Sequence, residues 1–83
     1  MDSVENIASL VETLVAPLVD YPDDLEVTAE EAEDGTILAE IRVNEEDAGK
    51  VIGRQGRVIK AIRTLARAAA SRDGVAVEVE LVD

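Results

Sequence analysis

The 83-residue sequence contains no cysteine and no histidine. Their absence removes the thiolate and imidazole nucleophiles, the usual zinc ligands and the commonest general base at neutral pH. We therefore expect a protein that is not an enzyme and that needs no metal or cofactor. Residues 1–5 lack the basic start and apolar stretch of a signal peptide, and no apolar run approaches the roughly 18 residues of a membrane span. The expectation is a cytoplasmic protein with no membrane partner.

Aromatic residues are nearly absent as well, because Tyr21 is the only one in the chain. This excludes a stacking platform for bases, and it leaves Val, Ile, Leu and Ala to fill the core. The length suits one domain with a thin two-layer core, and it is too short for a catalytic domain beside a substrate domain. Since no linker, repeat or low-complexity tract interrupts the chain, we treat residues 1–83 as one domain.

Apolar periodicity predicts a helix and a hairpin in the N-terminal half. Apolar residues at spacings of three and four form one face of a helix that Ser3 caps and that Pro17 bends or ends. Alternating apolar residues then predict strands over 25–30 and 37–43, joined by an Asp-Gly turn.

The C-terminal half predicts two helices and one strand. Asn44 is a suitable cap for a short helix over 45–52, which has three acids in its first turn where the macrodipole favours them. A longer helix is expected over 57–71, and residues 75–81 alternate as a third strand. The predicted order is α-β-β-α-α-β, which makes an α+β fold.

Charge is distributed very unevenly along the chain. The net charge of −11 argues by itself against a nucleic-acid partner, since a polyanion repels a polyanion. However, residues 48–72 carry seven bases and no acid, whereas residues 1–47 carry fifteen acids and one base. This segment is therefore a candidate site for an anionic ligand, although a solvated basic helix face is the alternative interpretation.

Two glycines lie within the cationic segment, between the two predicted helices. Gly53 and Gly56 bracket Arg54 and Gln55, and each glycine permits a close backbone approach that a Cβ would forbid. The second glycine also stands at the start of the long helix, whose free N–H groups and positive dipole end attract a phosphate. An ordinary helix-to-helix turn is the alternative, but it would need at most one glycine as a cap.

The segment Val51-Ile52-Gly53-Arg54-Gln55-Gly56-Arg57-Val58-Ile59-Lys60 resembles the V-I-G-x-x-G-x-x-I/V-K core of KH domains. The preceding helix and strand resemble the bacterial type II order, with a minimal β-α-α-β unit over about 36–82 and an extension over 3–32. This resemblance implies a three-stranded mixed sheet with the helices on one face, and a groove that clamps about four nucleotides of single-stranded RNA. The RNA-binding residues that it implies are Lys50, Val51, Ile52, Gly53, Arg54, Gln55, Gly56, Arg57 and Lys60.

Two further segments resemble one particular group of KH proteins. Ala16-Pro17-Leu18-Val19-Asp20 and Glu46-Asp47-Ala48-Gly49-Lys50 are similar to segments of the small stand-alone bacterial KH proteins of the KhpA family. That resemblance implies an RNA chaperone or post-transcriptional regulator in the cytoplasm, a homodimer, and pairing with a larger KH-containing protein called KhpB or Jag. The rest of the chain is strongly acidic, which differs from the basic surface that is usual for an RNA-binding protein.

The long helix is predicted to have an apolar face, a basic face and a stripe of small residues between them. The apolar face comprises Val58, Ile62, Leu65, Ala66 and Ala69, and the basic face comprises Lys60, Arg63 and Arg67. Ala61, Thr64 and Ala68 form the stripe, which we interpret as a dimer interface or as a plain exposed flank. The competing function is accordingly a protein-interaction module with little RNA affinity.

Overall fold

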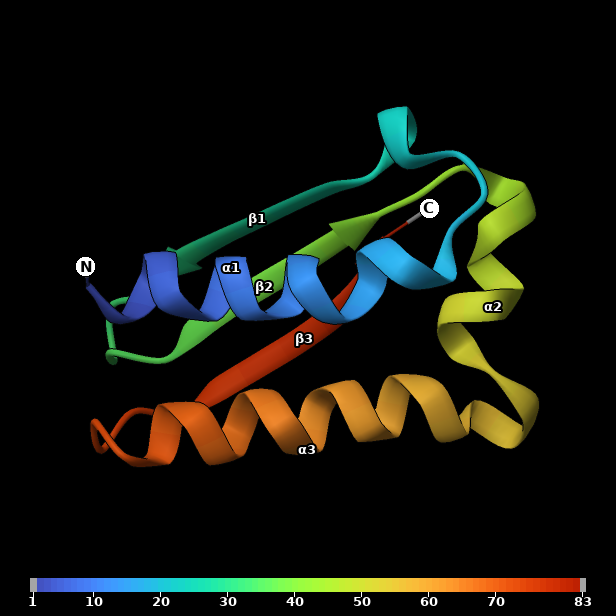
Figure 1. Ribbon diagram of the computed structural model, residues 1–83. Helices are drawn as coiled ribbons and strands as arrows, with labels where there is room; N and C mark the ends of the chain where they lie inside the picture. Colours follow the sequence, from blue (N-terminus) through green and yellow to red (C-terminus); the bar gives the residue numbers. More distant parts are fainter. Residues whose placement is uncertain (1, 83) are drawn as a thin grey trace.

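The computed structural model describes residues 2–82 and has the predicted order of elements (Figure 1). The elements are α1 (Ser3–Val15), β1 (Glu26–Glu31), β2 (Ile37–Arg42), α2 (Ala48–Ile52), α3 (Arg57–Ser71) and β3 (Val77–Val82). The predicted short helix over 45–52 begins as a 3₁₀ turn over Glu45–Asp47 before α2. No helix within residues 2–82 is long and apolar enough to cross a membrane.

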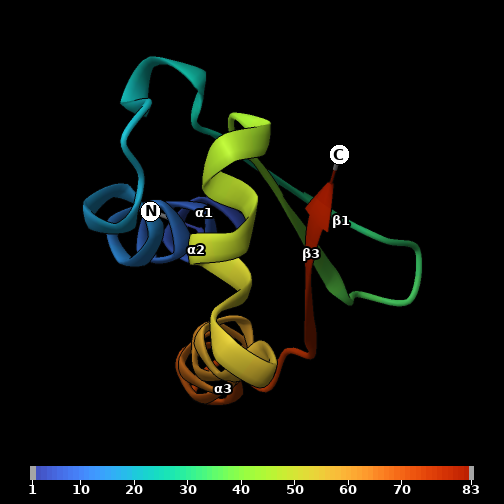
Figure 2. The same cartoon turned by 90° about the vertical axis from the view of Figure 1, so that its right-hand side faces the viewer.

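The three strands form one mixed sheet in the order β1-β2-β3. β1 pairs with β2 in the antiparallel sense, and β2 pairs with β3 in the parallel sense. A parallel pair needs a crossover, and α2 and α3 together supply it. Figure 2 shows the helices on one side of the sheet, so the α+β architecture expected from the resemblance is confirmed.

The core lies between this sheet and the helices, with β2 at its centre. Ile37, Ala39 and Ile41 of β2 are buried, while the residues between them point to the helix-free face. Ile7, Val11 and Val15 of α1 cover one part of the sheet, and Ile59, Ile62, Ala66 and Ala70 of α3 cover another. The buried hydrophobic side chains within residues 2–82 are therefore all aliphatic, as the composition predicted.

The predicted apolar face of the long helix is confirmed at Ile62 and Ala66, which are buried, and wrong at Leu65, which is exposed. The residues of α3 that reach the core are Ile59, Ile62, Ala66 and Ala70. Leu65, which we had placed in the core, is 49% exposed, and Val58 and Ala69 are only partly buried. The physical reason is that α3 packs against both β3 and α1. The side of α3 that faces both of these elements is buried, and it is rotated relative to the most apolar side of the helix.

Several element ends also differ from the prediction, most of them by one residue, and the starts of α1 and β3 have a clear physical reason. Asp2, not Ser3, caps α1, because the Asp2 carboxylate accepts the Glu5 backbone N–H at 2.9 Å. The third strand begins at Val77, not at residue 75. Val75 instead donates its N–H to the Ala70 carbonyl at 3.1 Å, and this bond closes the end of α3. Gly74, the residue before it, has a positive φ of 70°, which turns the chain back toward the helix end.

Candidate nucleic-acid interface

The loop between α2 and α3 has a backbone that requires its first glycine. Gly53 has φ +77° and ψ 173°, a region that only glycine adopts readily. A Cβ built on Gly53 would lie 2.9 Å from the backbone N and 2.8 Å from the Cβ of Val58, which is closer than real Cβ atoms come. Gly53 thus lets the loop pass directly over the first turn of α3.

The second glycine is constrained by its conformation and not by its neighbours. Gly56 has φ +74° and ψ 15°, and a Cβ there would meet only the end of the Lys60 side chain, at 3.9 Å. Gln55 also has a positive φ, +58°, which is uncommon for a residue with a side chain. Three residues with positive φ in four give the chain the sharp reversal that brings α2 onto α3.

This reversal leaves two backbone donors of the loop without an acceptor in the described part of the chain. Gly53 donates its N–H to the Gly49 carbonyl and Gly56 donates to the Gly53 carbonyl, at 2.9 and 3.1 Å. The N–H groups of Arg54 and Gln55 have no acceptor within residues 2–82, and no side chain caps the start of α3. Successive free N–H groups beside a helix N-terminus form a concave site for an anion such as a phosphate.

Cationic side chains surround these donors. Arg54, Arg57 and Lys60 are exposed, and none is within ion-pairing distance of a carboxylate among residues 2–82. Arg57 donates from Nη2 to Gln55 Oε1 at 2.9 Å, which holds its guanidinium beside the loop and leaves the Gln55 amide N–H₂ group pointing elsewhere. The loop therefore combines neutral donors with positive charge that no protein anion cancels.

Lys50, in contrast, has its charge satisfied within the protein. Its ammonium pairs with the carboxylates of Asp20 and Asp47. These hydrogen bonds, first the one to Asp20 and then the one to Asp47, raise the pKa of the Lys50 ammonium above its ordinary value. Among the seven bases of residues 48–72, Lys50 is the only one that forms an ion pair within the described chain.

Asp47 is the centre of this network, and sequence reasoning did not single it out. Its carboxylate is fully buried and accepts the backbone N–H groups of Asp20 and Tyr21, both at 3.0 Å. Burial alone would raise the pKa of this carboxyl, but the two N–H donors and Lys50 outweigh burial and lower it. The network fastens α2, and with it the glycine loop, to the connection between α1 and β1.

The apolar pair before the loop is split between the core and the surface. Val51 is fully buried and supports α2 from beneath, whereas Ile52 is 42% exposed. Ile52 alone therefore presents an apolar surface beside the loop. Of the nine residues implied for RNA binding, Ile52 to Arg57 and Lys60 lie together around the loop, while Val51 is buried and the exposed Lys50 is paired with Asp20 and Asp47.

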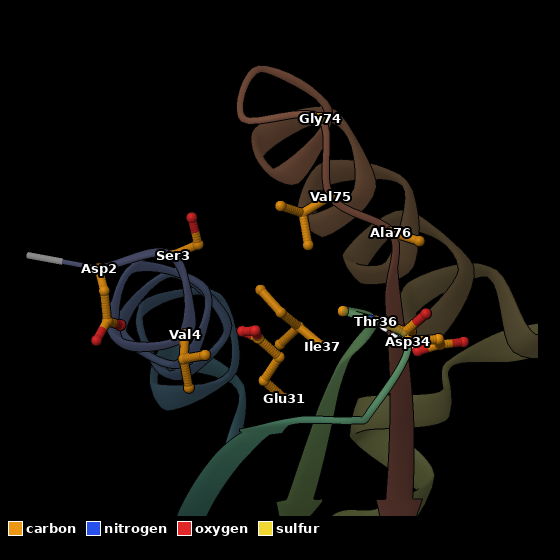
Figure 3. A pocket seen from close by; sticks show the side chains of 11 residues that line it. Asp2, Ser3, Val4, Glu31, Asp34, Thr36, Ile37, Gly74, Val75 and Ala76 are labelled. Carbon is orange, nitrogen blue, oxygen red and sulfur yellow. Dashed lines mark hydrogen bonds between the residues drawn. The ribbon is translucent and has the colours of Figure 1, made fainter.

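A cavity lies at the other end of the molecule, beside the β1–β2 turn and the start of α1 (Figure 3). It measures about 570 Å³ and is lined by the carboxylates of Asp2, Glu31 and Asp34 and by no basic side chain. An acidic cavity repels phosphate. No cluster of carboxylates within residues 2–82 is arranged to hold a metal ion.

The stripe proposed for self-association is exposed. Ala61, Thr64 and Ala68 lie on the solvent side of α3, and Ala68 borders a shallow apolar groove of about 410 Å³ between α1 and α3. Leu10, Leu14 and the half-exposed Leu65 line the same groove. The stripe is thus continuous with apolar surface that the sequence had assigned to the core.

The elements follow one another in the order α-β-β-α-α-β, the sheet is mixed, and a Gly-X-X-Gly loop joins the last two helices. This combination defines a KH domain of the type II arrangement. The family model of the KhpA/KhpB KH domain matches residues 8–81. The chain belongs to this family.

Relatives in several bacteria support the assignment over the whole length of the chain. The chain is 42% identical to "RNA-binding protein KhpA" of Borreliella burgdorferi over 83 residues, which cover 100% of both chains. It is 48% identical to the protein of the same name from Leifsonia xyli, over 93% of this chain and 97% of the relative. The Bacillus subtilis protein of that name is 43% identical over 95% of this chain and 96% of its own length.

Solved structures share the fold. The chain superposes on a crystal structure of Era in complex with MgGDPNP and nucleotides 1506–1542 of 16S ribosomal RNA, with a TM-score of 0.70 and 23% identity. The match covers 98% of this chain and 30% of that Era chain. Aquifex aeolicus Era bound to GDP and an aluminium fluoride gives a TM-score of 0.68 at 20% identity, over 99% of this chain and 32% of that chain. At these identities the likeness concerns the fold.

Proposed function

We propose that this protein binds single-stranded RNA by clamping its backbone at Gly53–Gly56, and that it acts on cytoplasmic RNA as a chaperone or post-transcriptional regulator. The observation that carries the proposal is the loop itself. Two free N–H groups, an uncapped helix start and three unpaired cations converge there, in a chain whose net charge is −11. Relatives that match over their whole length carry the name RNA-binding protein, which agrees with this function.

The proposed contact is a backbone clamp. A phosphate sits over the N–H groups of Arg54 and Gln55 at the start of α3, and Arg54, Arg57 and Lys60 neutralise it and its neighbours. Ile52 offers an apolar contact to a base beside the loop. Because the chain has one aromatic residue, base stacking contributes little, and affinity rests on phosphate contacts. Lys50 joins these contacts only if its pairing with Asp20 and Asp47 is broken.

The test is the double variant Arg54→Asp with Gln55→Asp, which adds two anions at the phosphate site on an exposed loop. Fluorescence anisotropy with a short single-stranded RNA should show binding lost, while the circular dichroism spectrum stays unchanged. The matched control is Ser71→Asp with Arg72→Asp, which makes the same change in charge on exposed residues at the other end of α3. The proposal fails if the folded loop variant binds as the wild type does, or if both pairs weaken binding equally.

We also propose a homodimer formed through α3, with Ala61, Thr64 and Ala68 at its centre. The apolar groove beside this stripe, with Leu65 half exposed, favours a protein contact on this side. The same surface suits a larger KH-containing partner of the KhpB or Jag kind, as the family resemblance implies. Ala61→Arg should shift the mass measured by light scattering from dimer to monomer, and Glu12→Arg, on an exposed position of α1, serves as the control. A wild type that stays monomeric at high micromolar concentration contradicts the dimer.

A further inference from the structure

Arg63 differs from every other basic residue around the loop. Arg54, Arg57, Lys60 and Arg67 are exposed, whereas Arg63 is partly buried. Its Nε donates to the backbone carbonyl of Val79 on β3, at 3.1 Å. Sequence reasoning had placed Arg63 on the solvent-facing basic side of the long helix. The structure places it instead on the flank of α3 that faces β3.

The carbonyl that holds Arg63 belongs to the outer edge of the sheet. β3 is an edge strand, and the Ala76 carbonyl accepts the Ile37 N–H of β2. Because successive peptide groups of a strand point in opposite directions, the carbonyls of Glu78 and Glu80 also face β2 and that of Val79 faces away. Arg63 therefore lies where α3 meets an edge that no strand covers.

One hydrogen bond fixes this guanidinium and leaves most of it available. Arginine has five N–H donors, of which the bond to Val79 uses one, and no carboxylate within residues 2–82 pairs with Arg63. The remaining donors lie on the two Nη atoms and form a planar fork of restricted orientation. A fork held in this way is suited to two acceptors that lie side by side.

The position of Arg63 relative to the loop suits a base more than a phosphate. It follows Gly56 by seven residues of helix, about 10 Å along the axis, which lies within a track of roughly four nucleotides. In the proposed clamp, the exposed side chains of Arg54, Arg57 and Lys60 contact the solvent-facing phosphates. Arg63 lies between α3 and β3, where it would contact a nucleobase of the same RNA strand that turns toward the protein.

We propose that Arg63 reads a base with two adjacent hydrogen-bond acceptors, which rests on the RNA binding proposed above. Guanine offers O6 and N7, and cytosine offers O2 and N3. Adenine and uracil have no two adjacent acceptors. They therefore cannot accept both N–H groups of the fork. Arg63 is thus a residue that determines specificity, and the clamp at the loop supplies affinity for any sequence.

The experiment compares short adenine oligoribonucleotides that differ at one central position: adenine, uracil, cytosine, guanine or 7-deazaguanine. The wild type should bind the guanine or the cytosine oligonucleotide about 5- to 150-fold more tightly than the adenine one, as a bidentate contact provides. If guanine is the preferred base, 7-deazaguanine should remove the preference, because it lacks N7. Arg63→Lys should bind the adenine oligonucleotide within about twofold of the wild type and lose the preference. Arg67→Lys, on the exposed face one turn further, should keep it.

Three results overturn the inference: equal affinity of the wild type for all five oligonucleotides, a preference that survives Arg63→Lys, or a preference lost equally in Arg67→Lys. The comparisons among oligonucleotides use the wild type alone, so equal affinities there overturn the inference even if Arg63→Lys does not fold. Failure of the proposed function looks different, because the wild type would then bind none of the oligonucleotides at any salt concentration.

Discussion

Replacing Gly53 with alanine should destabilise the domain several times more than replacing Gly56. At Gly53 the φ/ψ pair lies in a region that costs a residue with a Cβ about 1–3 kcal/mol. The Cβ would also meet the Val58 backbone N at 2.9 Å, which adds about 1–3 kcal/mol of overpacking. The reduced freedom of the unfolded chain returns about 0.4–1 kcal/mol. The midpoints of these ranges give a net loss of roughly 3 kcal/mol.

Gly56 supplies the internal comparison. Its left-handed conformation costs alanine about 1–2 kcal/mol, no close contact adds to this, and the unfolded-state gain offsets about half. Asparagine tolerates this conformation, so Gly56→Asn should be nearly neutral.

Thermal and urea unfolding followed by circular dichroism would measure both losses. A domain of this size loses about 4–8 °C in Tm for each kcal/mol, so Gly53→Ala should lower Tm by at least about 10 °C and Gly56→Ala by only a few degrees. Equal losses in the two variants, or a harmless Gly53→Ala, would refute the assignment of the close approach to Gly53.

Three further predictions concern charge. First, the lowered pKa of Asp47 stabilises the fold at pH values above about 4, and this contribution disappears as pH falls through the lower pKa of the folded state. The difference in unfolding free energy between wild type and Asp47→Asn should therefore shrink in urea titrations below about pH 4, and a difference that does not change with pH would contradict this. Second, Glu40 and Glu80 are register partners on the helix-free face of the sheet, so Glu80→Gln should add about 0.2–1 kcal/mol of stability and reduce the stabilisation by salt; an unchanged salt response would contradict this. Third, if Arg54, Arg57 and Lys60 each neutralise one phosphate, the slope of log affinity against log salt should be near about −2, and an affinity indifferent to salt would exclude the clamp.

The order of elements and the loop could be predicted because both depend on neighbours in sequence. Alternation over β2, the glycine pair and the cap at Asn44 are local signals, and the Asn44 side chain does accept the Glu46 N–H at 2.9 Å. Asp2 and Ser3 are both suitable caps in adjacent positions, so the choice between them depended on backbone geometry that periodicity does not report.

The remaining features of the site depend on contacts between distant segments. Asp47 accepts N–H groups from residues 26 and 27 positions earlier, and nothing in its surroundings in sequence distinguishes it from Glu45 and Glu46. A helical wheel separates an apolar from a polar side of α3, but it does not show that Arg63 lies on the flank that meets the edge of β3. Leu65 was misplaced for the same reason, since α1 and β3 together decide which stripe of α3 is covered.

The central claim is that RNA is held at the loop between α2 and α3. The most direct test is a titration of ¹⁵N-labelled protein with a short single-stranded RNA, following the backbone amide signals. The account predicts the largest shifts at Arg54 and Gln55, whose N–H groups are free, with smaller shifts along Lys60 and Arg63, and weaker effects with a duplex of equal length. Shifts confined to the α1–α3 groove or to the helix-free face of the sheet, with the loop amides unmoved, would contradict it.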